Sequence, residues 1–256
     1  MAIHLIGYRT SVLTNGTLAA LTPVPDPTVT INGNLIYVPD KYNQIVNAFA
    51  LTKGAQAFTH AQLQAPSLRE TFYPDIAGLF LGAAATGERQ IDDYAQNPIQ
   101  LKTNEGLEFY SDGGGNGTAA QDAYGLVWLS DGKLSTVGGK VMRIRATAAA
   151  TLVAGTWVNS ALTFDQTLPV GKYDVIGLRA VGANLVAARL QFIGASAVTR
   201  AGVPGAASEQ ASGFPQFRMG ASGSFGSFDS VTPPSMEFLG DTDTSQVVYL
   251  DLVKTG

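Results

Sequence analysis

The chain has 256 residues, which is enough for one large domain or for two of about 125 residues each. Its net charge is −4, and only 14% of its residues are charged, against roughly 25% in a typical soluble domain. Phosphate binding needs clustered lysine and arginine side chains, so this composition argues against direct binding of nucleic acid. The absence of cysteine excludes disulfides and thiol chemistry.

The low charge has two explanations that composition alone leaves open. Part of the outside faces other subunits, or the surface is covered by uncharged polar side chains. The N-terminus lacks the basic start and long apolar core of a signal peptide. The longest near-apolar run, residues 76–85, is about half of the roughly twenty residues that a membrane-spanning helix needs. We therefore expect a soluble protein made in the cytoplasm of its producer.

Short candidate strands separated by turn residues follow one another through the first half. The clearest hairpin is residues 28–38, where Asn32-Gly33 tolerates the positive φ of a tight turn. Pro66 is a plausible start for a helical turn at residues 67–71. The other elements expected here are strands at residues 3–13, 17–22, 45–51, 55–64, 99–101 and 107–110, a hairpin of strands 125–129 and 133–137, a strand or short helix at 76–85, and loops at 88–97 and 112–117.

The second half begins at Gly138-Gly139, where we expect the boundary between the two units. Its most regular stretch is residues 168–193, which predict two apolar strands joined by a short loop at 182–184. Further strands are expected at residues 140–147, 157–164 and 246–250. Residues 194–230 are rich in Gly, Ser and Ala and are expected to be irregular.

Five segments of the first half recur in the same order in the second half. They are residues 17–22 with 151–156, Lys41-Tyr42 with Lys172-Tyr173, 61–64 with 188–191, 106–112 with 235–241, and 125–129 with 246–250, at offsets of 134, 131, 127, 129 and 121. Short β segments resemble one another by chance, but their shared order favours a duplication. The alternative is a single large β protein with chance matches.

These patterns predict an all-β fold with little helix. Short strands at intervals of about ten residues indicate a sandwich or a barrel, and each half holds about eight candidate strands. We expect two tandem antiparallel β-sandwiches, a double jelly roll, with the first jelly-roll unit at residues 1–138 and the second at 139–256.

The chain has few residues of the types that form catalytic or metal sites. Its two histidines, His4 and His60, cannot supply several imidazole ligands in each half, and neither lies near a nucleophile elbow. Ser222 lies in a Gly/Ser-rich segment without the strand and helix that such an elbow needs. We expect no catalytic, cofactor-binding or metal-binding residues, no cofactor, and no enzymatic activity.

Carboxylate pairs and aromatic side chains keep other chemistry open. Paired carboxylates can cleave glycosides or, with other oxygen ligands, bind calcium, but solvated turn residues are the expected role. The carboxylate pairs are Asp92 with Asp93, Asp241 with Asp243, and Glu105 with Glu108, and the candidate calcium ligands are Asp241 with Asp243 and Asp112 with Asn116. Aromatic residues at repeat-matched positions are expected in the core, with a carbohydrate platform as the alternative. They are Tyr42, Tyr173, Phe109, Phe238, Trp128 and Tyr249.

A cysteine-free, weakly charged tandem of β units resembles the double jelly-roll major capsid proteins of small internal-membrane phages, of the corticovirus, tectivirus and finnlakevirus types. The residues that carry the resemblance are the repeat pairs, above all Leu168-Pro-Val-Gly-Lys-Tyr and Val38-Pro-Asp-Lys-Tyr. It implies a virion structural protein, a major capsid protein whose homotrimers form pseudo-hexagonal units of an icosahedral shell.

The same resemblance implies the partners and the location. The partners would be further copies of the chain in the capsid lattice and other virion proteins such as a penton or minor capsid protein, with an internal membrane as an open alternative and no direct contact with nucleic acid. The protein would be found in the virion after synthesis in the host cytoplasm. Two alternatives remain, a carbohydrate-binding or glycoside-processing β-sandwich protein and a phage decoration or spike protein.

Overall fold

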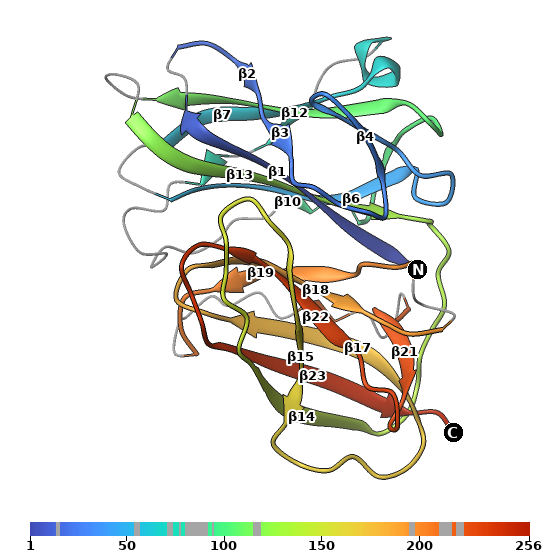
Figure 1. The fold of residues 1–256 in the computed structure, drawn as a ribbon. Helices are drawn as coiled ribbons and strands as arrows, with labels where there is room; N and C mark the ends of the chain where they lie inside the picture. Colours follow the sequence, from blue (N-terminus) through green and yellow to red (C-terminus); the bar gives the residue numbers. More distant parts are fainter. Residues whose placement is uncertain are drawn as a thin grey trace. The chain divides into compact units, whose positions relative to one another are not determined.

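The protein is all-β, as expected from the sequence (Figure 1). The computed structural model describes residues 1–13, 16–53, 57–70, 74–76, 78–79, 92–93, 95–114, 119–194, 198–209, 217–218 and 223–256. Their strands form three sheets of seven, six and ten strands, accompanied by one short 3-10 helix, η1 (Pro66–Glu70). No helix in this part of the chain is long and apolar enough to cross a membrane.

The chain divides into two compact units. The first unit is Ile6–Asp131, and the second unit is Met1–Leu5 together with Gly132–Gly256. The first strand, β1 (Ile3–Leu13), therefore gives its opening residues to the second unit and the rest to the first. Within the second unit, the Leu5 amide donates a hydrogen bond to the Arg200 carbonyl at 2.8 Å.

The first unit contains two of the sheets. The seven-stranded sheet comprises β1, β3 (Thr22–Pro23), β6 (Gln44–Lys53), β9 (Gly78–Leu79), β10 (Asp92–Asp93), β11 (Ile99–Gln100) and β13 (Ala119–Ser130). The six-stranded sheet comprises β2 (Ala19–Ala20), β4 (Thr30–Asn32), β5 (Leu35–Tyr37), β7 (Ala57–Gln64), β8 (Asp75–Ile76) and β12 (Gly106–Gly114).

The core of the first unit lies between these two sheets. A Cβ atom on Gly125 of β13 would lie 2.6 Å from the ring of Phe109 on β12, so these strands approach each other closely across the core. Phe109 is fully buried, and its ring centroid lies 5.8 Å from that of Tyr8 on β1. The Tyr8 hydroxyl is satisfied inside the core because it donates to the Leu107 carbonyl at 2.7 Å.

The second unit is built on one sheet of ten strands. They are β14 (Val141–Ala148), β15 (Val158–Ala161), β16 (Thr163–Phe164), β17 (Lys172–Val181), β18 (Leu185–Gln191), β19 (Gly202–Ala206), β20 (Phe217–Arg218), β21 (Gly226–Asp229), β22 (Ser235–Gly240) and β23 (Gln246–Lys254). The path β15-β22-β18-β19-β17-β23-β14-β16 mixes one parallel pairing with antiparallel ones.

This continuous sheet corrects the resemblance inferred from the sequence. A jelly roll keeps two separate sheets, whereas β19 pairs in parallel with β17 and antiparallel with β18 and so joins them into one nearly closed sheet. Two glycines of β19 permit the close approach, because a Cβ on Gly202 would lie 2.5 Å from the Ala188 carbonyl oxygen and one on Gly205 would collide with Leu185. The expected match to double jelly-roll major capsid proteins of internal-membrane phages is therefore wrong.

The two units nevertheless repeat one pattern of strand pairing. In the first unit β6 pairs with β13 and β7 with β12, and in the second β17 pairs with β23 and β18 with β22. β6 and β17 also take a short parallel partner at the same place, where Ala50 lies beside Gly78 and Ala180 beside Gly205.

Two irregularities of these ladders recur as well. One extra residue interrupts the pairing at Val46 of β6 and at Ile176 of β17, positions 130 residues apart. A second extra residue is Thr59 of β7 and Val186 of β18, positions 127 residues apart. Bulges set local twist and register and are retained within related folds. Their shared positions confirm the internal duplication predicted from the sequence.

The pairing also corrects the alignment of the repeat. The offset of 127 holds for β7 and β18, but Tyr110 corresponds to Glu237, 127 residues on, where the sequence match gave 129. Likewise Leu126 corresponds to Tyr249, 123 residues on, where the sequence match gave 121. β2 corresponds to β15 at an offset of 139, so the match of residues 17–22 with 151–156 is wrong.

Most of the individual elements agree with the sequence predictions. The predicted hairpin is formed by β4 and β5, although its turn is Gly33-Asn34, because Asn32 pairs with Leu35 and Gly33 has a φ of +61°. β17 and β18 are the two strands expected within residues 168–193, but each pairs with other strands. The expectation that residues 194–230 are irregular is wrong for their described part, which contains β19, β20 and β21. The strand expected at 133–137 is not formed. The segments predicted at 76–85, 88–97 and 112–117 lie partly outside the described residues.

Candidate functional site

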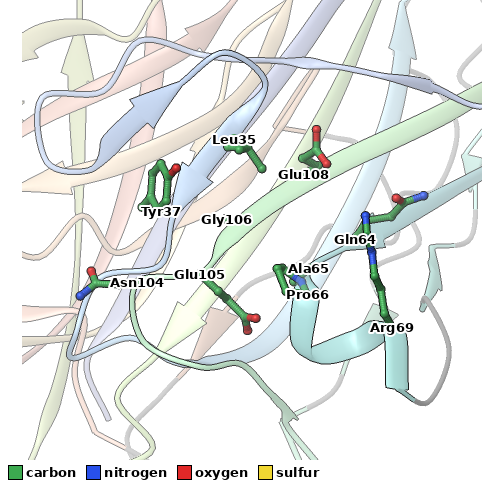
Figure 2. A pocket seen from close by; sticks show the side chains of 10 residues that line it. All are labelled: Leu35, Tyr37, Gln64, Ala65, Pro66, Arg69, Asn104, Glu105, Gly106 and Glu108. Carbon is green, nitrogen blue, oxygen red and sulfur yellow. The ribbon is translucent and has the colours of Figure 1, made fainter.

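A pocket of about 440 Å³ lies in the first unit, on the six-stranded sheet beside η1. Figure 2 shows Tyr37 on one side, Gln64 and Arg69 on the other, and the small residues Gly106 and Ala65 between them. The lining residues are Leu35, Tyr37, Gln64, Ala65, Pro66, Arg69, Asn104, Glu105, Gly106 and Glu108. The site therefore combines one aromatic ring with amide, carboxylate and guanidinium groups.

Strand register brings these side chains together. Tyr37 on β5 pairs with Gly106 on β12, and Glu108 on β12 pairs with Gln64 on β7. Because side chains alternate along a strand, Gly106 and Glu108 share one face of the sheet, while the fully buried Leu107 points to the other. The pocket thus lies on the face opposite the core, where Tyr37, Gln64 and Glu108 are half-exposed.

Glu105 holds the wall of the pocket in place. Its Oε1 accepts hydrogen bonds from the Lys102 amide at 2.6 Å and from the Ser67 hydroxyl at 2.5 Å. Its Oε2 accepts one from the Ser67 amide at 2.9 Å. The carboxylate therefore ties the start of η1 to the turn before β12, a turn in which Asn104 has a φ of +60°. Both oxygens of this buried carboxylate serve the structure.

The Glu105 and Glu108 pair predicted from the sequence does not form a catalytic pair. Glycoside hydrolysis needs two carboxylates directed at one bond. Residues three apart in an extended chain point to opposite sides, and Figure 2 shows the two carboxylates directed apart. Glu108 Oε2 instead accepts a hydrogen bond from the Tyr110 hydroxyl at 3.3 Å.

The charge of Glu108 affects the pKa of Tyr8, a residue of the core beneath the pocket. The pKa of Tyr8 is raised well above its ordinary value of 10, first because the phenol is fully buried and second because the nearby Glu108 carboxylate disfavours a phenolate. The Tyr8 hydroxyl therefore remains a neutral hydrogen-bond donor at all physiological pH values.

Among the other carboxylates named from the sequence, Asp243 has a local structural role. Asp243 Oδ1 caps a turn by accepting hydrogen bonds from the Thr244 and Ser245 amides, at 2.8 and 3.2 Å. Asp92 and Asp93 form β10, which pairs with β6. Asn116 and Ser222 lie outside the described residues. Within the described ranges, no group of three or more His, Cys, Asp or Glu side chains could hold a metal ion.

The histidines and the repeat-matched aromatics lie on strands, except Tyr42, which lies between β5 and β6. His4 is buried in β1, and His60 lies on β7 opposite Asp112. The prediction that the repeat-matched aromatics are core residues is confirmed for the five that are buried: Tyr42, Tyr173, Phe109, Phe238 and Trp128. Tyr249 is half-exposed, and the Arg179 guanidinium carbon lies 5.5 Å from its ring centroid.

Sequence reasoning missed a buried ionic cluster in the second unit. Arg189 is fully buried and donates from Nε to Glu237 Oε2 at 2.6 Å. Arg200 Nε lies 3.4 Å from the same oxygen, and the Trp157 ring centroid lies 4.1 Å from the Arg189 guanidinium carbon. Arg189 also donates to the Leu5 carbonyl at 3.0 Å. An arginine inside the apolar segment 185–190 was the available sign of this cluster.

Comparison with known proteins gives no family for this chain. No family model matches it, and no curated protein matches it. A solved structure, that of PBSX exported protein XepA, is similar over 98% of this chain and 86% of that chain, at 10% sequence identity and a TM-score of 0.24. A likeness this weak carries no argument, and it offers no support for the major capsid protein resemblance.

Proposed function

We propose that this chain is a structural protein of a virus particle and assembles with copies of itself into a shell. The observation that supports the proposal is the duplicated pairing pattern, with both extra residues at matching places. In this proposal three chains around a threefold axis supply six β units with the same pairing pattern to one ring. Such rings can tile a closed surface.

The composition of the surface also supports self-assembly. Only 14% of the residues are charged, and several aliphatic side chains are more than half exposed. They are Leu134, Val153, Val170, Ile193, Val198 and Val231. Exposed aliphatic side chains that cluster mark contact surfaces.

Two of these side chains lie on loops that are hydrogen-bonded to each other. The Gly171 amide donates to Ser230 Oγ at 3.0 Å, and the Ser230 amide donates to the Gly171 carbonyl at 2.9 Å. Val170 and Val231, next to these residues, are 81% and 75% exposed. We call this pair of valines the aliphatic tip. Its backbone is fixed before any contact forms, which lowers the entropic cost of association.

The mass of the purified protein in solution tests the proposal. Light scattering after size exclusion should give about three times 26.7 kDa, or a much larger species, and negative-stain imaging should show rings or shells. Trimers that never form shells would favour a decoration or spike protein. A monomer at every concentration would contradict self-assembly.

A double variant tests whether the aliphatic tip takes part. Val170→Asp combined with Val231→Asp should shift the protein toward monomer, because each aspartate must be dehydrated in a contact. Val153→Asp, at a side chain that is 55% exposed on another loop, is the matched control and should leave the mass unchanged. Equal masses for all three proteins would exclude the tip from the contact.

A further inference from the structure

The pocket of the first unit has the chemistry of a sugar-binding site. We infer that it binds a neutral oligosaccharide, with the ring of Tyr37 packed against a sugar ring and with Gln64 and Glu108 bonded to its hydroxyl groups. This role is independent of the proposed shell function. Its volume of about 440 Å³ lies within the roughly 300–1,000 Å³ of small-molecule sites.

Tyr37 provides the apolar part of the recognition. The residue opposite it across the ladder is Gly106, so no side chain of that strand lies beside the aromatic ring. A Cβ at Gly106 would lie 2.6 Å from Leu35 Cδ2, which explains why the floor of the pocket is a glycine. An aromatic face with a polar tip suits a ligand that presents C–H groups on one side and hydroxyl groups at its edge.

Gln64 and Glu108 provide the polar part. They are direct cross-strand neighbours and both are half-buried. Gln64 Nε2 donates to Gln62 Oε1 at 2.9 Å, which orients the amide. Sugar hydroxyls both donate and accept hydrogen bonds, and an amide beside a carboxylate offers both kinds of partner.

The charge of the pocket selects a neutral ligand. Glu105 and Glu108 outnumber Arg69, so the lining has an excess of one negative charge. An acidic sugar would meet this excess and lose binding energy. Since both oxygens of Glu105 already accept hydrogen bonds from Lys102 and Ser67, a single carboxylate faces the ligand. This supports binding rather than cleavage.

The second unit supplies an internal control, because it carries the same strand positions without this pocket chemistry. Gln191 corresponds to Gln64, and Ser235 corresponds to Glu108. There Gln191 Oε1 accepts hydrogen bonds from Asn159 Nδ2 at 2.6 Å and from Ser235 Oγ at 3.3 Å. The oxygen of the equivalent amide thus accepts two hydrogen bonds within the protein, whereas at Gln64 the nitrogen donates one, to Gln62.

The experiment uses the full chain and a panel of neutral di- to tetrasaccharides of glucose, galactose and N-acetylglucosamine, followed by calorimetric titration of the best binder. We expect Tyr37→Ala and Gln64→Ala each to weaken binding by about tenfold or more, equivalent to about 1.4 kcal/mol. Gln191→Ala should leave binding within about twofold of the parent. Glu108→Gln keeps the shape of the side chain and should weaken binding without unfolding the protein.

Two results would overturn the inference. One is the absence of binding by every saccharide of the panel at millimolar concentration. The other is undiminished binding by Glu108→Gln and Gln64→Ala in protein that retains the parent circular dichroism spectrum. Loss of self-assembly in these variants is not expected, so the outcome is separate from the test of the shell function.

Discussion

Removal of the Glu237 carboxylate tests the buried arginine cluster of the second unit. Arg189 is fully buried and Arg200 nearly so, and both guanidinium groups approach Glu237 Oε2, at 2.6 and 3.4 Å. Removing one partner of a buried ion pair costs about 3–5 kcal/mol, because the other charge stays in a low dielectric. We expect Glu237→Ala to reach the upper part of that range, since it leaves two cations behind.

A double-mutant cycle separates this charge effect from simple loss of packing. Glu237→Ala combined with Arg189→Met should be less destabilised than the sum of the two single variants, because methionine leaves no fully buried cation. Arg189→Met alone also loses the contact with the Trp157 ring, worth about 0.5–2 kcal/mol. Additive effects in the cycle would refute the assignment of the loss to an unpaired buried charge.

Urea unfolding followed by tryptophan fluorescence can report on the units separately. The chain has two tryptophans, and Trp128 lies in the first unit while Trp157 lies in the second. In a Trp128→Phe background the signal comes from the second unit alone. The control is Asp165→Asn, because the Arg145–Asp165 pair spans 3.0 Å between side chains that are 38% and 39% exposed. Water screens such a pair, so no measurable change is expected.

Three further predictions concern single buried groups. Because the folded state keeps Tyr8 protonated after the unfolded state loses that proton near pH 10, stability should fall above pH 10, by up to about 1.4 kcal/mol per pH unit. Tyr8→Phe should remove this slope in pH-dependent unfolding, and an unchanged slope would contradict the assignment. Gly125→Ala should cost about 1–3 kcal/mol in urea unfolding, because the added methyl meets the Phe109 ring, and an unaffected midpoint would mean that the core can yield. Asp251→Asn should lower the melting temperature through a loss of about 1.5–3 kcal/mol, because the carboxylate is 1% exposed and accepts two hydrogen bonds from Arg143 on β14. An unchanged melting temperature would show that an amide can replace the carboxylate.

The sequence predicted the β class and the duplication because both depend on alternation and order. It did not predict the register of the repeat on β12 and β13, and the reason is physical. A shift of two residues leaves every side chain on the same face. The sequence match therefore paired Leu126 with Val247, two residues before its structural equivalent Tyr249, and both alignments put the side chains on the same face. Only the hydrogen-bonded partners decide between the two registers.

The pocket could not be predicted from the sequence for a different reason. Tyr37, Gln64 and Glu108 come from three strands and share a face only after β5, β12 and β7 have paired. Sequence proximity instead drew attention to Glu105 and Glu108, whose separation of three residues directs them apart. In the second unit, the bridging role of β19 was hidden because its glycines predicted an irregular segment, although they are what allows close pairing.

The duplication also indicates where the two units can differ in function. Val127 and Leu250 hold equivalent core-facing positions and are both fully buried, because the packing between strands constrains them. On the other face of the same strands, Trp128 of the first unit corresponds to Asp251 of the second, a buried apolar ring to a buried carboxylate. The packing between the sheets fixes the fold, whereas the other face of these strands has diverged between the units. Glu108 lies on such a face of the six-stranded sheet, which is where a binding site can arise in one unit without cost to the architecture shared by both.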